Sequence, residues 1–172
     1  KRIHKAGAVF DTEKLKWMNS QYLMNLDIEV IAERTKPWFE KAGIDTDNHE
    51  KYLKVVDNAR RRVSTLAEMP DESYMFYGEI ILSKDNEEMI VNEKSKNVLI
   101  HLHDRLENTC ELDGDTFKQL VLETGNETGV KGKDLFFPIR TALYGQPRGP
   151  EIPHLFSILG KEDTIKRLKR FL

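Results

Sequence analysis

The stretch "DNHEKYLKVVDNARRRV", residues 47–63, carries an apolar stripe with the period of a helix. Its apolar members stand at positions i, i+3, i+4, i+7 and i+11, which are Tyr52, Val55, Val56, Ala59 and Val63. Side chains at that spacing share one face of a helix, and Asp47 or Asn48 can cap the first turn. The stretch therefore predicts an amphipathic helix that runs into three consecutive arginines.

The same period appears upstream of this stretch. One helix is predicted with Asp11 or Thr12 as its cap and with Leu15, Met18, Tyr22 and Leu26 on one face. Asp27 can cap the next helix, which Gly43 ends. Because proline lacks an N–H group, we expect Pro37 to kink or interrupt that second helix.

Downstream, residues 71–78 predict a short aromatic helix, and residues 79–92 fit either a strand or a helix. A further helix is predicted over residues 93–110, and another begins after a cap at Asp115. A third is predicted around residues 135–145, and two short helices follow over residues 153–159 and 161–171. Residues 123–129 read as a loop and residues 146–153 as a rigid turn. The chain is thus predicted to be all-α.

The domain organisation follows from the polar turn at residues 111–115, which is the best boundary signal in the chain. It divides a helical-bundle subdomain over residues 27–112 from a second one over residues 113–172. Residues 1–26 are expected to belong to a preceding region.

Composition indicates a globular chain of 172 residues, 39% of them hydrophobic, which is enough for a core. Cys110 is the one cysteine, so no intrachain disulfide can form and a cytoplasmic location is the default. No apolar run approaches the roughly 18 residues of a membrane helix, and no signal-peptide pattern is visible. We expect a monomer that does not bind membranes.

The charge distribution is uneven, although the formal net charge is −2. Residues 1–62 carry +3, residues 63–128 carry −10 and residues 129–172 carry +5. A basic region can bind a polyanion even when the whole chain is acidic. Random variation over a solvated surface is the alternative.

Catalytic and metal-binding patterns are weak. His101 and His103 are two residues apart, which places them about 200° apart on a helix, and no cysteine cluster accompanies them. No nucleotide-binding loop or nucleophile motif occurs. The sequence therefore predicts no catalytic residue, no metal site and no cofactor in this chain.

Two stretches favour nucleic-acid binding. Guanidinium groups at residues 60–62 suit a base edge or a phosphate, although the run alone slightly favours a solvated basic helix end. Residues 129–162 place aromatic side chains beside cations and prolines, which is typical of surfaces that stack unpaired bases. The alternative there is a pair of core aromatics with lysines outside.

Three segments resemble bacterial glutamyl-tRNA synthetases, which are class I enzymes. They are "KAGAVFDTEKLKWMN" (residues 5–19), "YLKVVDNARRRVSTLAEMPDESYMFY" (52–77) and "GVKGKDLFFPIRTALYGQPRGPEIPHLFSILGKE" (129–162). The resemblance implies that the chain is the end of the stem-contact region plus the helical anticodon-binding cage. It implies a parent enzyme, glutamate–tRNA ligase, which joins glutamate to tRNA(Glu) with ATP and Mg²⁺. The catalytic domain is not in this chain, so we expect the fragment alone to be inactive.

The resemblance also implies which residues contact the anticodon. Arg62 matches an arginine that contacts the third anticodon base and rejects the glutamine anticodon, with Arg60 and Arg61 as alternative registers. The other implied contacts come from Arg140, Phe137, Gly149, Pro150, Ile152 and Pro153, with phosphate contacts from Arg61, Lys131, Lys133 and Arg148. Tyr144 replaces the family's usual threonine. We expect Arg62 and Arg140 to be helix positions that open onto one hollow; a helical protein-interaction module is the competing hypothesis.

Overall fold

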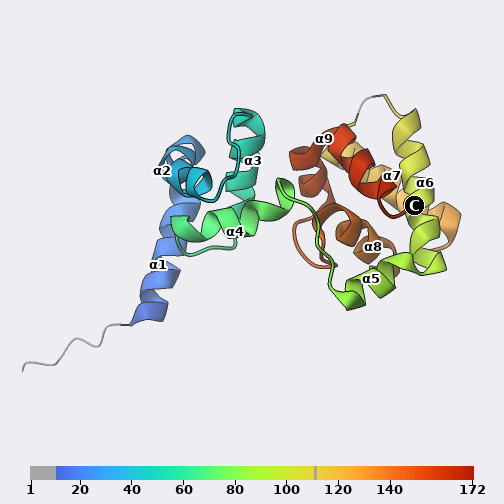
Figure 1. Cartoon of the computed structure of the whole chain (residues 1–172), viewed down its shortest axis with the longest axis horizontal. Helices are drawn as coiled ribbons and strands as arrows, with labels where there is room; N and C mark the ends of the chain where they lie inside the picture. The colour runs from blue at the N-terminus through green and yellow to red at the C-terminus, as the bar shows by residue number, and fades with distance from the viewer. Residues whose placement is uncertain (1–10, 111) are drawn as a thin grey trace, which may run out of the picture. The chain divides into compact units, whose positions relative to one another are not determined.

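The computed structural model describes residues 11–110 and 112–172, and every regular element within those ranges is helical (Figure 1). The prediction of an all-α chain is confirmed. None of the helices in these ranges combines the length and the apolar character needed to cross a bilayer. The chain divides into two compact units between Ser73 and Tyr74, which are described separately below.

Over residues 11–73, the described part of the first unit, there are four α-helices and one 3-10 helix. They are α1 (Thr12–Asn25), α2 (Ile28–Lys41), α3 (His49–Ala59), η1 (Leu66–Glu68) and α4 (Met69–Ser73). Helix α2 packs against α3, η1 and α4, and α3 also packs against α4. The apolar stripe predicted from residues 47–63 is the buried face of α3, since Tyr52, Val55, Val56 and Ala59 are all buried.

An aromatic pair fixes α2 against α3. The rings of Phe39 and Tyr52 meet edge to face, with centroids 5.1 Å apart. The Tyr52 hydroxyl also donates a hydrogen bond to the Ala32 carbonyl oxygen at 2.8 Å. These contacts hold α2 on both sides of Pro37. The helix continues to Lys41, so an interruption at Pro37 is wrong, while the alternative of a kink stays a prediction.

Helix α1 begins where the sequence predicts, since Asp11 accepts a hydrogen bond from the Lys14 amide at 3.0 Å. Its apolar side chains are nevertheless mostly exposed in this unit, with Trp17 at 63% and Tyr22 at 65%. Leu23 is the buried residue of the helix. The predicted face of Leu15, Met18 and Tyr22 therefore does not belong to the core of the first unit.

In the second unit, residues 74–110 and 112–172 form one 3-10 helix and five α-helices. They are η2 (Tyr74–Phe76), α5 (Lys84–Val91), α6 (Glu93–Asn108), α7 (Gly114–Thr128), α8 (Lys133–Tyr144) and α9 (Ile152–Lys169). Helices α6, α7, α8 and α9 pack around a common core, and α5 packs against α6 and α8. Phe117 and Phe156 stack within that core with centroids 4.4 Å apart.

The boundary between the units differs from the one expected at residues 112 and 113. That turn joins α6 to α7, and these two helices pack directly against each other. Arg105 on α6 forms ion pairs with two carboxylates of α7, Glu123 at 2.7 Å and Glu127. A polar turn of this length suits a tight helical hairpin as well as a domain boundary, which is why composition alone misplaces it.

Two further helix ends differ from the sequence prediction. Asp113, and not Asp115, caps α7, and the helix continues through the predicted loop to Thr128. Gly125 lies inside this helix, and its position has no room for a side chain, because a β-carbon would lie 2.6 Å from Leu135 and 2.8 Å from the Val130 carbonyl oxygen. By contrast, the break between two C-terminal helices is present, since Gly160 adopts φ 72° and ψ 177° inside α9.

Candidate nucleic-acid interface

Arg60, the first arginine of the run, is used inside the first unit. Its Nη1 donates to the Leu26 carbonyl oxygen at the end of α1, 3.1 Å away. Its Nη2 lies 2.5 Å from Asp57 Oδ1, and the side chain is 16% exposed. These contacts join α1 to α3, so Arg60 is the least suitable of the three arginines for contacting a ligand.

Arg61 is the most exposed of the three, at 52% of its side chain. Its Nη2 lies 2.8 Å from Oδ2 of Asp57, so Asp57 serves two arginines at once. Burial opposes ionisation of Asp57, but the hydrogen bond from Arg61 and the charges of Arg60 and Arg61 outweigh it and lower the pKa of the carboxyl group. Arg61 can therefore offer its outer edge to a phosphate while Asp57 holds the inner one.

Arg62 has a different set of partners and is held on two sides. Its Nη1 donates to the carbonyl oxygen of Asn58 at 3.2 Å and to Oδ1 of the same residue at 2.7 Å. Its Nε lies 3.5 Å from Glu72 Oε1 on α4. The side chain is 31% exposed. Arg62 is thus a partly exposed guanidinium with a fixed orientation.

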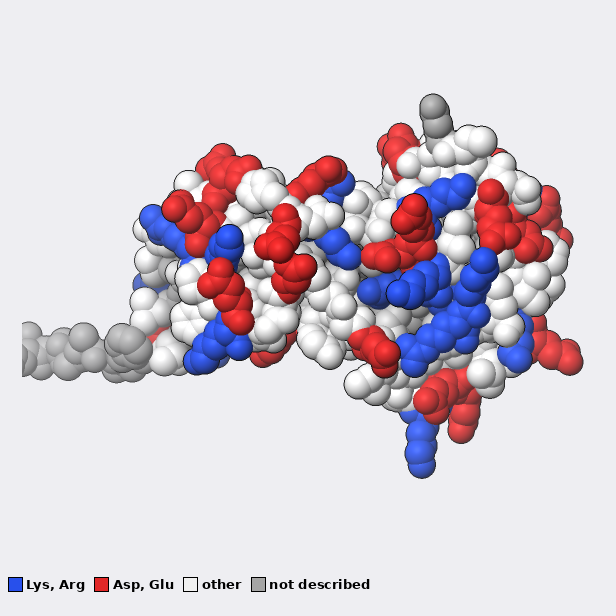
Figure 2. Space-filling view, turned by 45° about the horizontal axis from the view of Figure 1, so that its top comes forward, with Lys and Arg blue, Asp and Glu red and all other residues white. Residues whose placement is uncertain are grey.

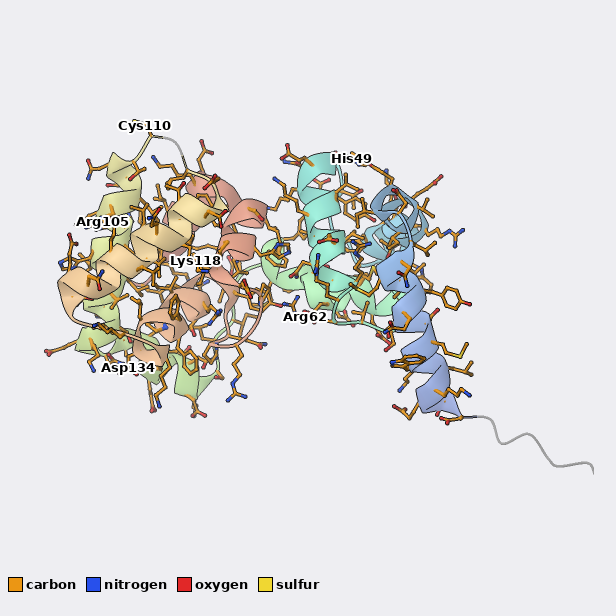
Figure 3. The ribbon with its side chains drawn as sticks, turned by 180° about the vertical axis from the view of Figure 1, so that it is seen from behind. His49, Arg62, Arg105, Cys110, Lys118 and Asp134 are labelled. Atoms are coloured by element: carbon orange, nitrogen blue, oxygen red, sulfur yellow. The ribbon has the colours of Figure 1, made fainter. Side chains whose placement is uncertain are left out.

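The expectation that Arg62 lies on a helix is wrong. Helix α3 ends at Ala59, and residues 60–62 form a turn in which the Arg62 amide donates to the Ala59 carbonyl oxygen at 2.9 Å. Figure 3 shows His49 and Arg62 toward opposite ends of α3. The turn aims Arg62 back toward Asn58, four residues earlier.

The second unit holds the other expected anticodon-reading arginine, Arg140 on α8. Its Nε donates to the Pro150 carbonyl oxygen at 3.1 Å, and its guanidinium carbon lies 5.9 Å from the centre of the Phe136 ring. Burial lowers the pKa of Arg140, and the charge of Glu151 opposes that shift. Arg140 is therefore a half-buried cation that joins α8 to the loop before α9.

That loop, residues 145–150, is fixed at three points. Arg140 holds Pro150, and Asn86 Nδ2 donates to the Gly145 carbonyl oxygen at 3.2 Å. Gly149 adopts φ 151°, and a β-carbon there would lie 2.7 Å from the ring of Tyr144. Tyr144, which replaces the family's usual threonine, is thus buried and packs directly against Gly149.

A hollow of about 410 Å³ lies beside the loop. It is lined by Ile81, Ser83, Asn86, Gly145, Gln146, Pro147 and Arg148. The lining combines apolar side chains with one cation and several polar groups. Such a site can receive a flat, partly polar ring.

The other expected site residues of the second unit fall into three groups by exposure. Lys131, Lys133, Arg148 and Gly149 are exposed, while Phe137 and Pro153 are half-buried. Pro150 and Ile152 are buried, and the Pro150 carbonyl oxygen already accepts the hydrogen bond from Arg140, so neither residue is exposed to a ligand in this structure. Figure 2 shows Lys and Arg side chains gathered on one face of the second unit, with acidic side chains around them.

Arg62 belongs to the first unit and Arg140 to the second. The hypothesis that both open onto one hollow therefore stays a prediction. Sequence reasoning missed the residues that orient Arg62. Asn58 was detectable in principle, because it lies four residues before the arginine; Glu72 pairs with Arg62 through tertiary packing, for which the sequence carries no signal.

The acidic, histidine and cysteine side chains of the described residues are the possible metal ligands of this chain. Within residues 11–110 and 112–172, no group of three or more His, Cys, Asp or Glu side chains is placed to hold an ion. His101 instead contacts the Asn97 carbonyl oxygen, 2.9 Å away, and His103 is buried beside Asp104. These contacts fit structural histidines.

Comparison with known proteins identifies the family. The model of the anticodon-binding domain family matches residues 30–172. Glutamate–tRNA ligase of Staphylococcus saprophyticus is 34% identical over 178 residues, covering 100% of this chain and 37% of the relative. The same ligase of Bacillus subtilis is 35% identical, covering 98% of this chain and 36% of the relative. The chain thus spans about a third of the length of these relatives.

Solved structures agree on the fold. A glutamate–tRNA ligase from Elizabethkingia meningosepticum, crystallised with its amino acid, matches 98% of this chain with a TM-score of 0.85 at 23% identity. A synthetase from Elizabethkingia anophelis matches the same share with a TM-score of 0.81. This chain covers 33% of each of those chains. The resemblance seen in the sequence is confirmed: the chain belongs to the anticodon-binding domain family, and its relatives are glutamate–tRNA ligases.

Proposed function

We propose that this chain binds the anticodon loop of tRNA(Glu) as the RNA-binding part of a glutamate–tRNA ligase. The proposal rests on one observation: Arg62 presents a partly exposed guanidinium in a fixed orientation, and the chain belongs to the anticodon-binding domain family. Sequence-specific proteins read RNA mainly at unpaired bases, whose edges and faces are accessible. The anticodon loop presents such bases.

Arg62 is suited to a base edge. A guanidinium has five N–H donors in a planar fork, and the two contacts with Asn58 fix the plane of that fork. Cytosine offers two adjacent acceptors, O2 and N3, on its pairing edge, whereas guanine presents N–H donors there. A fixed donor at this position therefore favours cytosine over guanine as the third anticodon base.

The second unit supplies a place for other bases of the loop. The three anchors of residues 145–150, of which Arg140 is one, hold the hollow of about 410 Å³ in shape before any ligand binds. A preformed site binds without the entropy cost of ordering the loop. Phe137 lies half-buried on the same helix as Arg140, where its ring edge can contact a base.

Exposed cations complete the proposed surface. Lys131, Lys133 and Arg148 are placed to neutralise phosphates of the loop, and Arg61 can do so in the first unit. Contacts of this kind add affinity without sequence information and weaken as salt rises.

In the longer protein, the proposed reaction joins glutamate to tRNA(Glu) with ATP and Mg²⁺. The described residues of this chain offer no ligand set for the ion. We therefore derive no catalytic step from them, and their proposed role is to select the tRNA.

The test is a binding titration of the 172-residue chain with a labelled anticodon stem-loop of tRNA(Glu), followed by fluorescence anisotropy. The control RNA has the same stem and the loop bases in a different order. We expect tighter binding to the natural loop and a loss of affinity for both RNAs as salt is raised. Equal affinity for the two loops at every salt concentration would contradict the proposal.

A further inference from the structure

Ile81, in the second unit, exposes more of its side chain than any other large apolar residue that the structure describes, at 80%. Its neighbour Ile80 is only 3% exposed. Both residues belong to the segment 79–83, which lies between η2 and α5 and has no regular structure (Figure 1). Such alternation is typical of an extended chain, in which successive side chains point to opposite sides. Burial of Ile80 therefore directs Ile81 to solvent.

The packing of Gly145 fixes Ile81 relative to the loop of residues 145–150. A β-carbon at Gly145 would lie 3.1 Å from Cγ2 of Ile80 and 4.0 Å from the carbonyl oxygen of Ile81. The Gly145 carbonyl oxygen also accepts the hydrogen bond from Asn86, on the helix that follows the segment. The segment and the loop thus hold each other, and Ile81 has a fixed place in the lining of the hollow of about 410 Å³.

This hollow suits an anionic ligand that carries a flat ring. Among the described residues of its lining, Arg148 is the only one with a charge, and it is exposed. Ser83, Asn86 and Gln146 add polar groups that can hydrogen-bond the edge of a ring. A nucleotide of an unpaired loop combines an apolar face, a polar edge and a phosphate, and the hollow has a partner for each of these parts.

A second hollow, of about 430 Å³, borders Ile81 on the same unit. Its apolar lining includes Val91, and its charged lining residues are Glu79, Glu87 and Arg170. Two carboxylates beside one guanidinium disfavour a phosphate, because like charges repel. Of the two hollows that share Ile81, the one that contains Arg148 is therefore the site for RNA.

We propose that Ile81 is a base-stacking residue: one unpaired base of the anticodon loop lies flat against its side chain, and an adjoining phosphate contacts Arg148. This inference rests on the proposed function, and it adds a residue that the family resemblance does not assign. Apolar side chains stack against bases that have left the helical stack. The contact removes apolar surface of Ile81 from water, where nearly all of it lies in the free chain.

The experiment measures the affinity of the 172-residue chain for the anticodon stem-loop of tRNA(Glu) and for a set of stem-loops that each lack one loop base. Ile81→Ala should weaken binding to the intact loop about three- to tenfold, since it removes most of the apolar contact. Against one of the abasic loops the substitution should have no effect, because the base that Ile81 contacts is already missing. A loss by the same factor for every RNA would overturn the stacking contact.

Salt dependence separates stacking from attraction to phosphate. Ile81→Ala should leave the slope of log affinity against log salt unchanged, because the contact is uncharged. Arg148→Ala should reduce the magnitude of that slope by about 0.7, the value for one phosphate of a single strand. A change of slope in Ile81→Ala would contradict an uncharged contact.

Val91→Ala is the matched control, because Val91 is 57% exposed on the same unit and lies outside the lining of the first hollow. It should leave the affinity for the intact loop unchanged. An equal loss in Val91→Ala and Ile81→Ala would overturn the assignment, since apolar surface in general would then be responsible. The thermal midpoint checks that both variants are folded.

The outcomes distinguish the two proposals. If the unchanged chain prefers the natural loop to the loop of reordered bases while Ile81→Ala binds the natural loop equally well, the role of Ile81 is wrong and the proposed function stands. If the unchanged chain shows no preference between these loops, the proposed function is overturned together with this inference.

Discussion

Arg140 donates a hydrogen bond from its Nε to the carbonyl oxygen of Pro150, 3.1 Å away, and so ties α8 to the loop that leads into α9. The contact uses one donor of the guanidinium and leaves others for a ligand. The residue that the family resemblance assigns to base recognition is thus also the residue that shapes the loop beside it. Loss of Arg140 should therefore affect RNA binding in two ways.

Arg140→Ala is predicted to weaken binding to the anticodon stem-loop by about tenfold or more, since one charge-assisted hydrogen bond contributes roughly 1.5–3 kcal/mol. Arg140→Lys should recover part of the phosphate attraction but not the fixed loop, because an ammonium group has no planar fork. Anisotropy titrations measure both. Lys118→Ala removes an exposed charge from α7 of the same unit and should have a small effect; an equal loss would mean that only net charge matters.

Gly149→Ala should distort the loop at residues 145–150. The backbone at this position has φ 151°, and the new β-carbon would meet the Tyr144 ring at 2.7 Å. We expect a destabilisation of about 1–3 kcal/mol, typical of a residue forced into a sparsely populated backbone region. Urea unfolding followed by circular dichroism measures this loss.

A second substitution separates the two causes of that loss. Tyr144→Thr in the Gly149→Ala background removes the ring against which the β-carbon collides, but it does not relieve the backbone strain. Relative to Tyr144→Thr alone, Gly149→Ala should then cost less than it does beside Tyr144. If the cost is the same in both backgrounds, contact with the ring has no part in it.

The helices themselves were largely predictable from local signals. The apolar stripe of α3 is buried as its spacing indicates, Asp11 and Asp27 cap α1 and α2, and Gly160 divides α9. Caps and periodic stripes act over one or two turns, so the sequence states them directly. The arginine run is equally visible in the sequence, but its role as a ligand surface stays a prediction.

What the sequence could not supply were the contacts made between elements. Glu72 reaches Arg62 because α4 packs against α3, and Asn86 reaches Gly145 because α5 packs against α8. The position of the boundary between the units depends on the packing of α6 against α7 in the same way. Local patterns also misjudged Pro37 and Gly125, where tertiary packing overrides a residue that usually ends or weakens a helix.

Arg167 should matter for stability more than for RNA binding. Its Nη1 donates to the carbonyl oxygens of Met75 at 2.8 Å and Leu143 at 2.6 Å, and burial lowers its pKa, opposed by Asp163. Arg167→Met would leave both carbonyl groups without this donor, at about 1–3 kcal/mol each. A lower urea midpoint is the expected result. Lys166→Met, an exposed neighbour on α9, should leave the midpoint nearly unchanged, and an equal shift in both variants would contradict the assignment.

Asp57 should make the stability of the first unit depend on pH. Although burial opposes its ionisation, Arg61 and Arg60 lower its pKa below the ordinary value of 3.8. A carboxyl group whose pKa is lower in the folded state stabilises that state above its unfolded pKa, and the contribution disappears as the pH falls through the folded value. We therefore expect Asp57→Asn to lower the free energy of unfolding by about 1–2 kcal/mol near neutral pH, a modest figure because the side chain is 23% exposed.

This loss of stability in Asp57→Asn should shrink toward about pH 3, since protonation removes the same charge from the unchanged chain. Urea midpoints of both chains at the two pH values test this. A cost that stays constant, or grows, as the solution becomes acidic would show that the two arginines do not stabilise the Asp57 carboxylate in the folded chain.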